Sequence, residues 1–260
     1  MRNIVFIGPG KTGSTWFYEY CKINYLCNLP KGIKETNLLL EDNWTPEMLQ
    51  RFFPSAEGVN LDISNTYIYN DNCISNLTRL YGEDLKIIIG VRDPIARFES
   101  SINFKIRRGE LSSNFHESEL ENNSELLEEL FIYSKVSHIK SLGLDVYYFD
   151  ILKFSSDINN RRLLLKKLGL TMPTNEVLPE RVNIASRHRI GLLRLLNPYL
   201  SAFLRKSGMH SILGFLKANR IVQNILFVRL DESEKFSFSR DYVDKLMTDN
   251  RMADFRSLRQ

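Results

Sequence analysis

A glycine- and hydroxyl-rich segment near the start of the chain carries the densest set of groups able to bind an anion. It reads Gly8-Pro9-Gly10-Lys11-Thr12-Gly13-Ser14-Thr15 and directly follows a run of four apolar residues. Glycines let the backbone amides approach a ligand closely, the lysine adds a full positive charge, and the hydroxyls donate to non-bridging oxygens. The segment therefore predicts a phosphate site, and its candidate binding residues are Gly10, Lys11, Thr12, Gly13, Ser14 and Thr15.

The order of residues in this segment differs from that of a nucleoside triphosphate loop. Such a loop ends Gly-Lys-Ser/Thr, so that the lysine reaches the outer phosphates and the next hydroxyl binds magnesium. Here Ser14 follows Gly13, and the lysine stands two residues earlier. The segment instead resembles the 5′-phosphosulfate loop of sulfotransferases that use 3′-phosphoadenosine 5′-phosphosulfate (PAPS), in which a Lys-Thr-Gly-Thr/Ser-Thr core follows the first strand.

A loop glutamate is the second candidate for chemistry. Glu35 lies in Lys34-Glu35-Thr36, just ahead of three leucines. Taken alone, a glutamate in a loop is usually solvated. The segment resembles the Lys-Glu pair of carbohydrate sulfotransferases, and this resemblance implies that Glu35 is the general base for the acceptor.

A basic residue at the end of an apolar strand is the third. Arg92-Asp93-Pro94 follows the strand predicted for 85–91, and Ser100 comes eight residues after Arg92. This pair matches the 3′-phosphate element of the same sulfotransferases, where the arginine fork and the serine hydroxyl donate to the phosphate. Residues 182–187 resemble the basic loop that closes over the nucleotide in that family, which adds Arg187 to the candidate binding residues.

Two further segments bear on the resemblance. Residues 148–152 look like the family's Tyr-Glu-Asp-Leu segment, and Asp62-Ile63-Ser64-Asn65-Thr66-Tyr67 resembles its Glu-Lys-Ser-x-x-Tyr element near the acceptor. Ile63 stands where many carbohydrate sulfotransferases have a lysine that assists catalysis. Any such contribution must be absent here or come from another residue.

The elements that position these residues follow from hydrophobic patterning. Apolar runs predict strands at 4–7, 59–63, 85–91 and 146–152, and periodicity predicts helices from 16, from 94, over 126–142 and over 159–168. Residues 107–124 are polar and are predicted to form a mobile segment or lid that contains His116. We expect an α/β fold: a P-loop-like three-layer domain with a central, mainly parallel sheet flanked by helices, plus a helical C-terminal part.

Length and composition limit the remaining possibilities. A chain of 260 residues with 43% hydrophobic residues fits a single domain over 1–260, with an α/β nucleotide-binding core at 1–178 and a basic helical portion at 179–260. The net charge of +4 suits an anionic cosubstrate without requiring one, and no nucleic-acid partner is expected. Three cysteines match no metal spacing, so no metal site is expected and a reducing compartment is favoured.

The first strand begins at residue 4, which predicts a cytoplasmic protein without a signal peptide. The apolar helices expected over 190–227 have two interpretations: packing against the domain, or peripheral contact with a membrane or a lipid-linked acceptor. Packing is favoured, since Pro198 and Gly208 break the segment into short pieces.

The resemblance to sulfotransferases implies an enzyme that moves a sulfuryl group from PAPS to a hydroxyl or amine of an acceptor, and it favours a carbohydrate. Lys11 and Glu35 are the predicted catalytic residues, PAPS is the cosubstrate, and no metal is required. Two alternatives remain, a divergent P-loop kinase and a non-catalytic nucleotide-binding scaffold.

Overall fold

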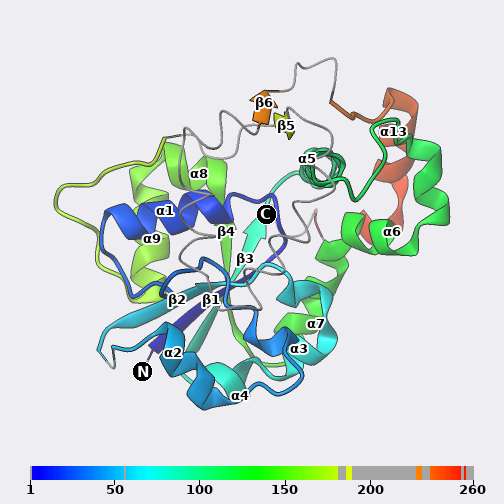
Figure 1. Cartoon of the computed structure of the whole chain (residues 1–260). Helices are drawn as coiled ribbons and strands as arrows, with labels where there is room; N and C mark the ends of the chain where they lie inside the picture. The colour runs from blue at the N-terminus through cyan, green and yellow to red at the C-terminus, as the bar shows by residue number, and fades with distance from the viewer. Residues whose placement is uncertain are drawn as a thin grey trace.

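Four parallel strands form the centre of the computed structural model, which describes residues 2–55, 57–180, 235–252 and 255 together with the backbone of 186–188 and 227–229. Their order in the sheet is β2-β1-β3-β4. The strands are β1 (Arg2–Gly8), β2 (Val59–Ile63), β3 (Leu85–Val91) and β4 (Asp145–Asp150). The two inner strands, β1 and β3, are mostly apolar because helices cover both faces of the sheet (Figure 1). The predicted α/β architecture is confirmed.

Three helices pack on one face of this sheet (Figure 1): α1 (Ser14–Ile23), α8 (Ile151–Ser156) and α9 (Ile158–Leu168). Aromatic rings fill the layer between them and the strands. The ring centroid of Phe149 lies 5.1 Å from that of Phe17 and 5.2 Å from that of Phe154. Because α1 begins where the phosphate loop ends, this packing fixes the direction in which the loop leaves the sheet.

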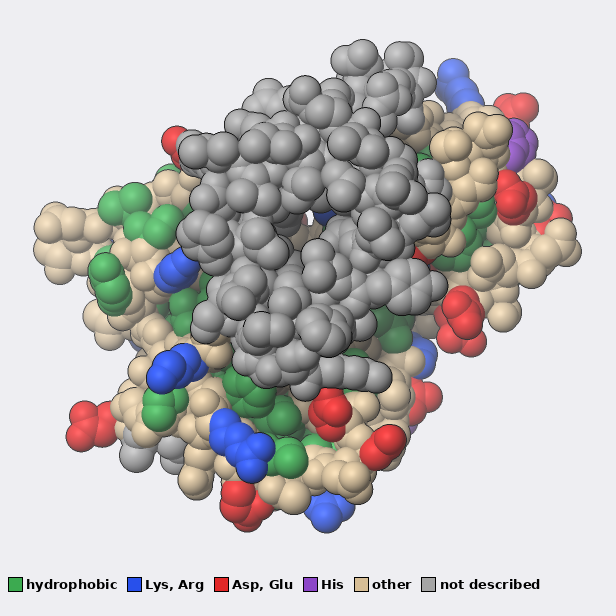
Figure 2. All heavy atoms as spheres, viewed as in Figure 1, with side chains coloured by type: hydrophobic (Ala, Val, Ile, Leu, Met, Phe, Trp, Pro, Cys, Tyr) green, Lys and Arg blue, Asp and Glu red, His purple; other side chains and the backbone are tan. Residues whose placement is uncertain are grey.

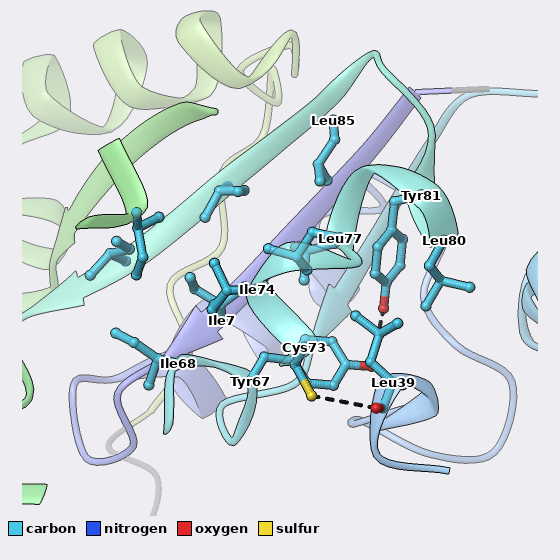
Figure 3. Packing of buried hydrophobic residues seen from close by; sticks show 14 of the residues in the cluster. Ile7, Leu39, Tyr67, Ile68, Cys73, Ile74, Leu77, Leu80, Tyr81 and Leu85 are labelled. Atoms are coloured by element: carbon cyan, nitrogen blue, oxygen red, sulfur yellow. Dashed lines mark hydrogen bonds between the residues drawn. The ribbon is translucent and has the colours of Figure 1, made fainter. Parts of the chain in front are cut away.

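The other face is covered by short helices: α2 (Leu49–Phe52), α3 (Asp71–Ser75), α4 (Leu77–Tyr81) and α7 (Lys135–Ser141). Three 3-10 segments lie in the same layer: η1 (Leu38–Leu40), η2 (Pro46–Met48) and η3 (Tyr67–Tyr69). Figure 3 shows Ile7 of β1 among Ile74, Leu77 and Tyr67, all of them buried. This layer holds the segment 34–40, which carries Glu35, against the carboxyl end of β2.

A third cluster lies beside the sheet and is built on α5 (Pro94–Arg108), the longest helix among the described residues. Around it pack η4 (Glu117–Asn122), α6 (Ser124–Leu130), α13 (Arg240–Thr248) and η7 (Asn250–Met252). Asp93 caps the start of α5 by accepting a hydrogen bond from the amide of Ala96 at 2.9 Å, and Gly109 ends the helix with φ 83°.

The structure corrects the expectation of a mobile lid over 107–124. Helix α5 continues through Arg108, and Phe115 and Leu120 are buried against it and its neighbours. His116 caps η4, where its ring Nδ1 accepts a hydrogen bond from the Ser118 amide. Apolar side chains spaced within this polar segment therefore anchor it to the third cluster.

The helix predicted over 126–142 is divided into α6, the 3-10 segment η5 (Ile132–Ser134) and α7. The interruption buries Tyr133 and places its hydroxyl at the end of β3, where it accepts a hydrogen bond from the Arg92 amide at 3.0 Å. It also lies 3.2 Å from the carbonyl oxygen of Gly90. Contacts between segments far apart in the chain thus override a continuous helical pattern.

The predicted helix at 159–168 is confirmed as α9, with Gly169 beyond its end at φ 74°. The predicted strand 146–152 ends two residues early, because Asp150 caps α8 and accepts hydrogen bonds from the next amides. Ile151 and Leu152 are therefore helical.

Beyond residue 180 the structure describes little. β5 (Ser186–His188) pairs antiparallel with β6 (Phe227–Arg229), and α13 is the one helix of eight or more residues described after 180. Nearly all of the apolar segment 190–227, and with it any membrane contact, lies outside the described residues. Within the described residues, no helix has both the length and the apolar character needed to cross a membrane.

On the face shown in Figure 2, several acidic side chains lie over the side of the molecule that carries α6 and α13.

Candidate active site

The loop between β1 and α1 lies at the carboxyl edge of the sheet, the edge where open parallel sheets bind ligands. Lys11 and Gly13 both have left-handed backbone, with φ 69° and 93°. A Cβ on Gly13 would lie 2.7 Å from the Cβ of Ile151, so no other residue fits. Helix α1 begins at Ser14 with neither a side-chain cap nor an acidic residue in its first turn. Its positive end is therefore well suited to an anion.

Thr12 has a different role in this loop from the one its hydroxyl suggests. Its Oγ1 donates to the carbonyl oxygen of Pro9 at 2.8 Å, and the residue is fully buried. The Thr12 side chain packs on Gly90 of β3, where an added Cβ would lie 2.0 Å from Thr12 Oγ1. The side chain of Thr12 thus anchors the loop to the sheet, which leaves its backbone amide for a ligand.

Lys11 lies in a cluster of cations. Its Nζ is 4.2 Å from the centroid of the Phe104 ring on α5, and its carbonyl oxygen accepts a hydrogen bond from Arg92 Nη1 at 3.0 Å. Burial, followed by the charges of Arg107, Arg92 and Lys34, lowers the pKa of Lys11 to about 8. Four positive side chains therefore converge here, an arrangement that is stable when an anion with several charges occupies the site.

The residues predicted for the 3′-phosphate are placed by β3 and α5. Arg92 follows β3 directly, and the hydroxyl of Tyr133 fixes its backbone. Ser100 lies one turn before Phe104, so it shares the face of α5 that meets Lys11. For Arg187 only the backbone is described: it pairs with Val228, and β5 lies next to α5.

Helix α5 is held in this position by a largely buried carboxylate from α6. Glu129 Oε2 lies 3.4 Å from Lys105 Nζ, and Glu129 also meets Arg97 and Ser101. Arg97 is fully buried. The contacts fix the rotation of α5, and with it the direction in which Ser100 and Phe104 face.

Glu35 lies beside the first turn of α1. Its Oε1 is 2.9 Å from Lys34 Nζ and 3.3 Å from Asn65 Nδ2. Lys34 Nζ also donates to Thr15 Oγ1 at 3.1 Å, and Asn65 Nδ2 to Ser14 Oγ at 3.1 Å. About a third of the Glu35 side chain, 32%, is exposed. The predicted base and the predicted phosphate loop thus share one site, and the base is open to a substrate.

The backbone next to Glu35 is fixed by a buried carboxylate. Asp62 accepts hydrogen bonds from the Thr36 amide at 3.1 Å, from the Thr36 hydroxyl at 2.5 Å, from Ser64 at 3.0 Å and from Tyr81 at 2.5 Å. Burial raises the pKa of Asp62, and these donors act in the opposite direction. The next residue, Ile63, is fully buried in the core. Ile63 therefore supplies no charge to the site, and Lys34, from the same loop as Glu35, contacts the Glu35 carboxylate.

Removing the Thr36 hydroxyl tests this anchor. Thr36→Val leaves a buried carboxylate oxygen with one donor fewer, and we expect a loss of about 1.5–3 kcal/mol in the free energy of unfolding, measured by urea denaturation. Thr36→Ser should restore most of it. The matched control is Thr66→Val, which removes an exposed hydroxyl bonded to Asn37 Oδ1 and should cost less than about 0.5 kcal/mol. Equal losses for Thr36→Val and Thr66→Val would contradict the role of Asp62.

Sequence reasoning missed Asn65 and Arg107 as members of the site. Arg107 comes three residues after Phe104 on α5, and that helical spacing is a signal that could have grouped them. Asn65 carries no comparable signal, because its partners Ser14 and Glu35 lie in two other segments. Among the described residues, no group of three or more His, Cys, Asp or Glu side chains is arranged to hold a metal ion. All three cysteines are free thiols.

Comparison with solved structures places this fold. The chain is similar to a sulfotransferase from Alicyclobacillus acidocaldarius, with a TM-score of 0.56 and 15% sequence identity over 81% of this chain and 94% of that one. The fold is that of a sulfotransferase. No protein-family model matches the sequence, and no curated protein does. At this identity the likeness establishes the fold, and the activity has to be argued from the site.

Proposed function

We propose that the protein transfers a sulfuryl group from PAPS to a hydroxyl or amine of a carbohydrate acceptor. The observation that carries the proposal is the meeting of Lys11, Arg92 and Glu35 at the positive end of α1. Lys11 and Arg92 suit a cosubstrate with two separate phosphate groups. The carboxylate suits a step in which a proton leaves the acceptor.

The proposed reaction is a direct transfer at sulfur. The acceptor oxygen or nitrogen attacks sulfur while the bond from sulfur to the bridging oxygen of the 5′-phosphate breaks. Glu35 takes the acceptor proton, and the bridging oxygen keeps the electron pair, giving 3′-phosphoadenosine 5′-phosphate (PAP). Lys11 and the loop amides stabilise the negative charge that builds on that oxygen. Arg92 and Ser100 hold the 3′-phosphate, and Arg187 belongs to the loop that closes over the nucleotide. Lys11 and the loop amides take the place that magnesium has in kinases.

A carbohydrate acceptor is proposed from the Lys34-Glu35 pair, which resembles that of glycan sulfotransferases. The charged atoms of the pair lie 2.9 Å apart, and the Lys34 and Glu35 side chains are only 24% and 32% exposed. A glycan offers many hydroxyls near one another, so a base fixed by Lys34 and Asn65 would select among them by position.

The kinase alternative is disfavoured because both candidate magnesium ligands are already engaged in hydrogen bonds. A P-loop kinase needs an acidic magnesium ligand at a strand end, and the candidates are Asp62 and Asp93. Asp62 is fully buried and already accepts four hydrogen bonds, and Asp93 caps α5. A scaffold without activity would have no use for a fixed, partly exposed glutamate beside the loop.

Titration of PAP and ATP against the protein, each with and without magnesium, separates the three functions. The proposed function predicts tight, magnesium-independent binding of PAP and weak binding of ATP. Magnesium-dependent binding of ATP would support the kinase. PAP binding without release of PAP from PAPS, over a panel of glycan acceptors, would support the scaffold.

The lowered pKa of Lys11 predicts that PAP binding takes up a proton. In the empty site the pKa is about 8, so at pH 8.5 part of the lysine is neutral. Bound phosphates favour the charged form and raise the pKa, so affinity should fall as the pH rises above about 8 and should level off below about 7. Phosphate itself titrates near pH 6 and adds little in this range.

Calorimetry at pH 8.5 in two buffers of different ionisation enthalpy measures this uptake. The observed enthalpy should depend on the buffer for the wild type and not for Lys11→Met. A wild-type enthalpy that is the same in both buffers would contradict the expected titration.

A further inference from the structure

Glu35 is held through one of its two carboxylate oxygens. Two donors from the described part of the chain contact it, Lys34 Nζ and Asn65 Nδ2, and both meet Oε1. Among the described contacts none involves Oε2. A carboxylate fixed in this way keeps one oxygen anchored and presents the other to a substrate proton.

The same two donors also contact the phosphate loop. Asn65 Nδ2 reaches Ser14 Oγ, and Lys34 Nζ reaches Thr15 Oγ1, each at 3.1 Å. Two parallel chains of hydrogen bonds therefore join the first turn of α1 to the base. Lys34 is the base's own neighbour in sequence, whereas Asn65 comes from the segment after β2.

Asn65 is seated against the loop by its backbone as well. A Cβ on Gly8 would lie 2.4 Å from the carbonyl oxygen of Asn65, so the absence of a side chain at Gly8 allows this close approach. The orientation of the Asn65 amide follows from its partners. A carboxylate only accepts, so the group facing Glu35 Oε1 is the NH₂.

A hydroxyl that accepts from Asn65 still has its own proton to donate. When a phosphate binds at the loop, the Ser14 hydroxyl can donate to it and continue to accept from Asn65. Hydrogen bonds in such a chain polarise and strengthen one another. We propose that Asn65 is a positioning residue that couples occupancy of the phosphate loop to the orientation of Glu35; the inference rests on the proposed function.

Two substitutions distinguish positioning from simple packing. Asn65→Ala removes the donor and some volume, whereas Asn65→Asp keeps the shape, replaces the donor by an acceptor and faces Glu35 with a like charge. If Asn65 only fills space, Asp should be tolerated at least as well as Ala. If it positions the base, Asp should be worse than Ala.

Turnover is measured as release of PAP from PAPS in the presence of glucosamine oligosaccharides, which offer both hydroxyl and amine groups. We expect Asn65→Ala to lower kcat by roughly 10- to 100-fold and Asn65→Asp by about tenfold more, with the Kd for PAP changed less than about fivefold. Melting temperatures should stay within about 3 °C of the wild type. The neighbouring Thr66→Ala, which removes an exposed hydroxyl, is the control and should leave both constants unchanged.

Crystal structures of the wild type and both variants, with and without PAP, give a readout that needs no acceptor. In Asn65→Asp the Glu35 carboxylate should move away from residue 65 and the adjacent Ser14. In Asn65→Ala it should occupy more than one orientation. An unmoved Glu35 in both variants would overturn the inference, as would Asp tolerated as well as Ala. If wild-type protein fails to bind PAP, the proposed function falls. The PAP-free structures then still show whether Asn65 holds Glu35.

Discussion

Glu35→Gln is expected to lower kcat by roughly 10²- to 10⁴-fold, the contribution typical of a positioned general base. Glutamine keeps the shape of the side chain and removes its basicity. The Kd for PAP should hardly change, because the phosphates are assigned to Lys11, the loop amides, Arg92 and Ser100. Sulfuryl transfer from labelled PAPS to glucosamine oligosaccharides and calorimetric titration of PAP measure the two constants separately.

The matched control is Glu41→Gln, an exposed glutamate six residues further along, which should leave both constants unchanged. Activity of Glu35→Gln within a few-fold of the wild type would refute the role of the base. Asp62 would be a poor alternative base because it is buried and accepts four hydrogen bonds. His116 would be a poor alternative as well, because its ring caps η4. Loss of PAP affinity together with activity would make Glu35 a structural partner of Lys34 and Asn65.

Lys11→Ala is expected to lower kcat by roughly 10²- to 10³-fold, the loss typical when one donor to a developing negative charge is removed. The Kd for PAP should rise by a smaller factor, about tenfold. The difference arises because the charge on the bridging oxygen is greatest in the transition state, so the ammonium stabilises that state more than the bound product. Rates at saturating PAPS and PAP titrations of the same preparation provide the comparison.

Lys22→Ala is the control, since Lys22 lies at the far end of α1 with a largely exposed side chain and should be silent. Unchanged turnover of Lys11→Ala at saturating PAPS would limit Lys11 to binding. A rise in Kd as large as the fall in kcat would show that its charge acts equally before and during the reaction.

The parts of the fold that were predictable are those coded by neighbouring residues. An apolar run followed by glycines, a lysine and hydroxyls predicts a strand, a phosphate loop and a helix start, and β1, the loop and α1 have this arrangement. The apolar run at 85–91 likewise predicts β3, and the carboxyl end of a parallel strand places Arg92 near the loop. Gly169 predicts the end of α9 because its backbone is left-handed.

What was missed depends on contacts between distant segments. Nothing around Tyr133 indicates that its hydroxyl meets the end of β3, so the helical pattern at 126–142 gave no reason to expect a break. Thr12 resembles Ser14 and Thr15 in type, yet Gly90 on another strand makes room for its side chain to turn inward. Asn65 belongs to the site because the fold places it, just after β2, beside Ser14 and Glu35, and its neighbours in sequence do not indicate this.

Calorimetric titration of PAP and of adenosine 5′-phosphate against the wild-type protein tests the central claim, that this site is built for a 3′-phosphorylated nucleotide. Arg92 and Ser100 can contact a 3′-phosphate only if the ligand carries one, and a charge-assisted contact by an arginine fork is strong. PAP should bind more tightly by about 2 to 4 kcal/mol, a factor of roughly 30 to 1,000. Arg92→Ala should remove most of that difference. Equal affinities of the wild type for the two nucleotides would contradict the assignment of the site to PAPS.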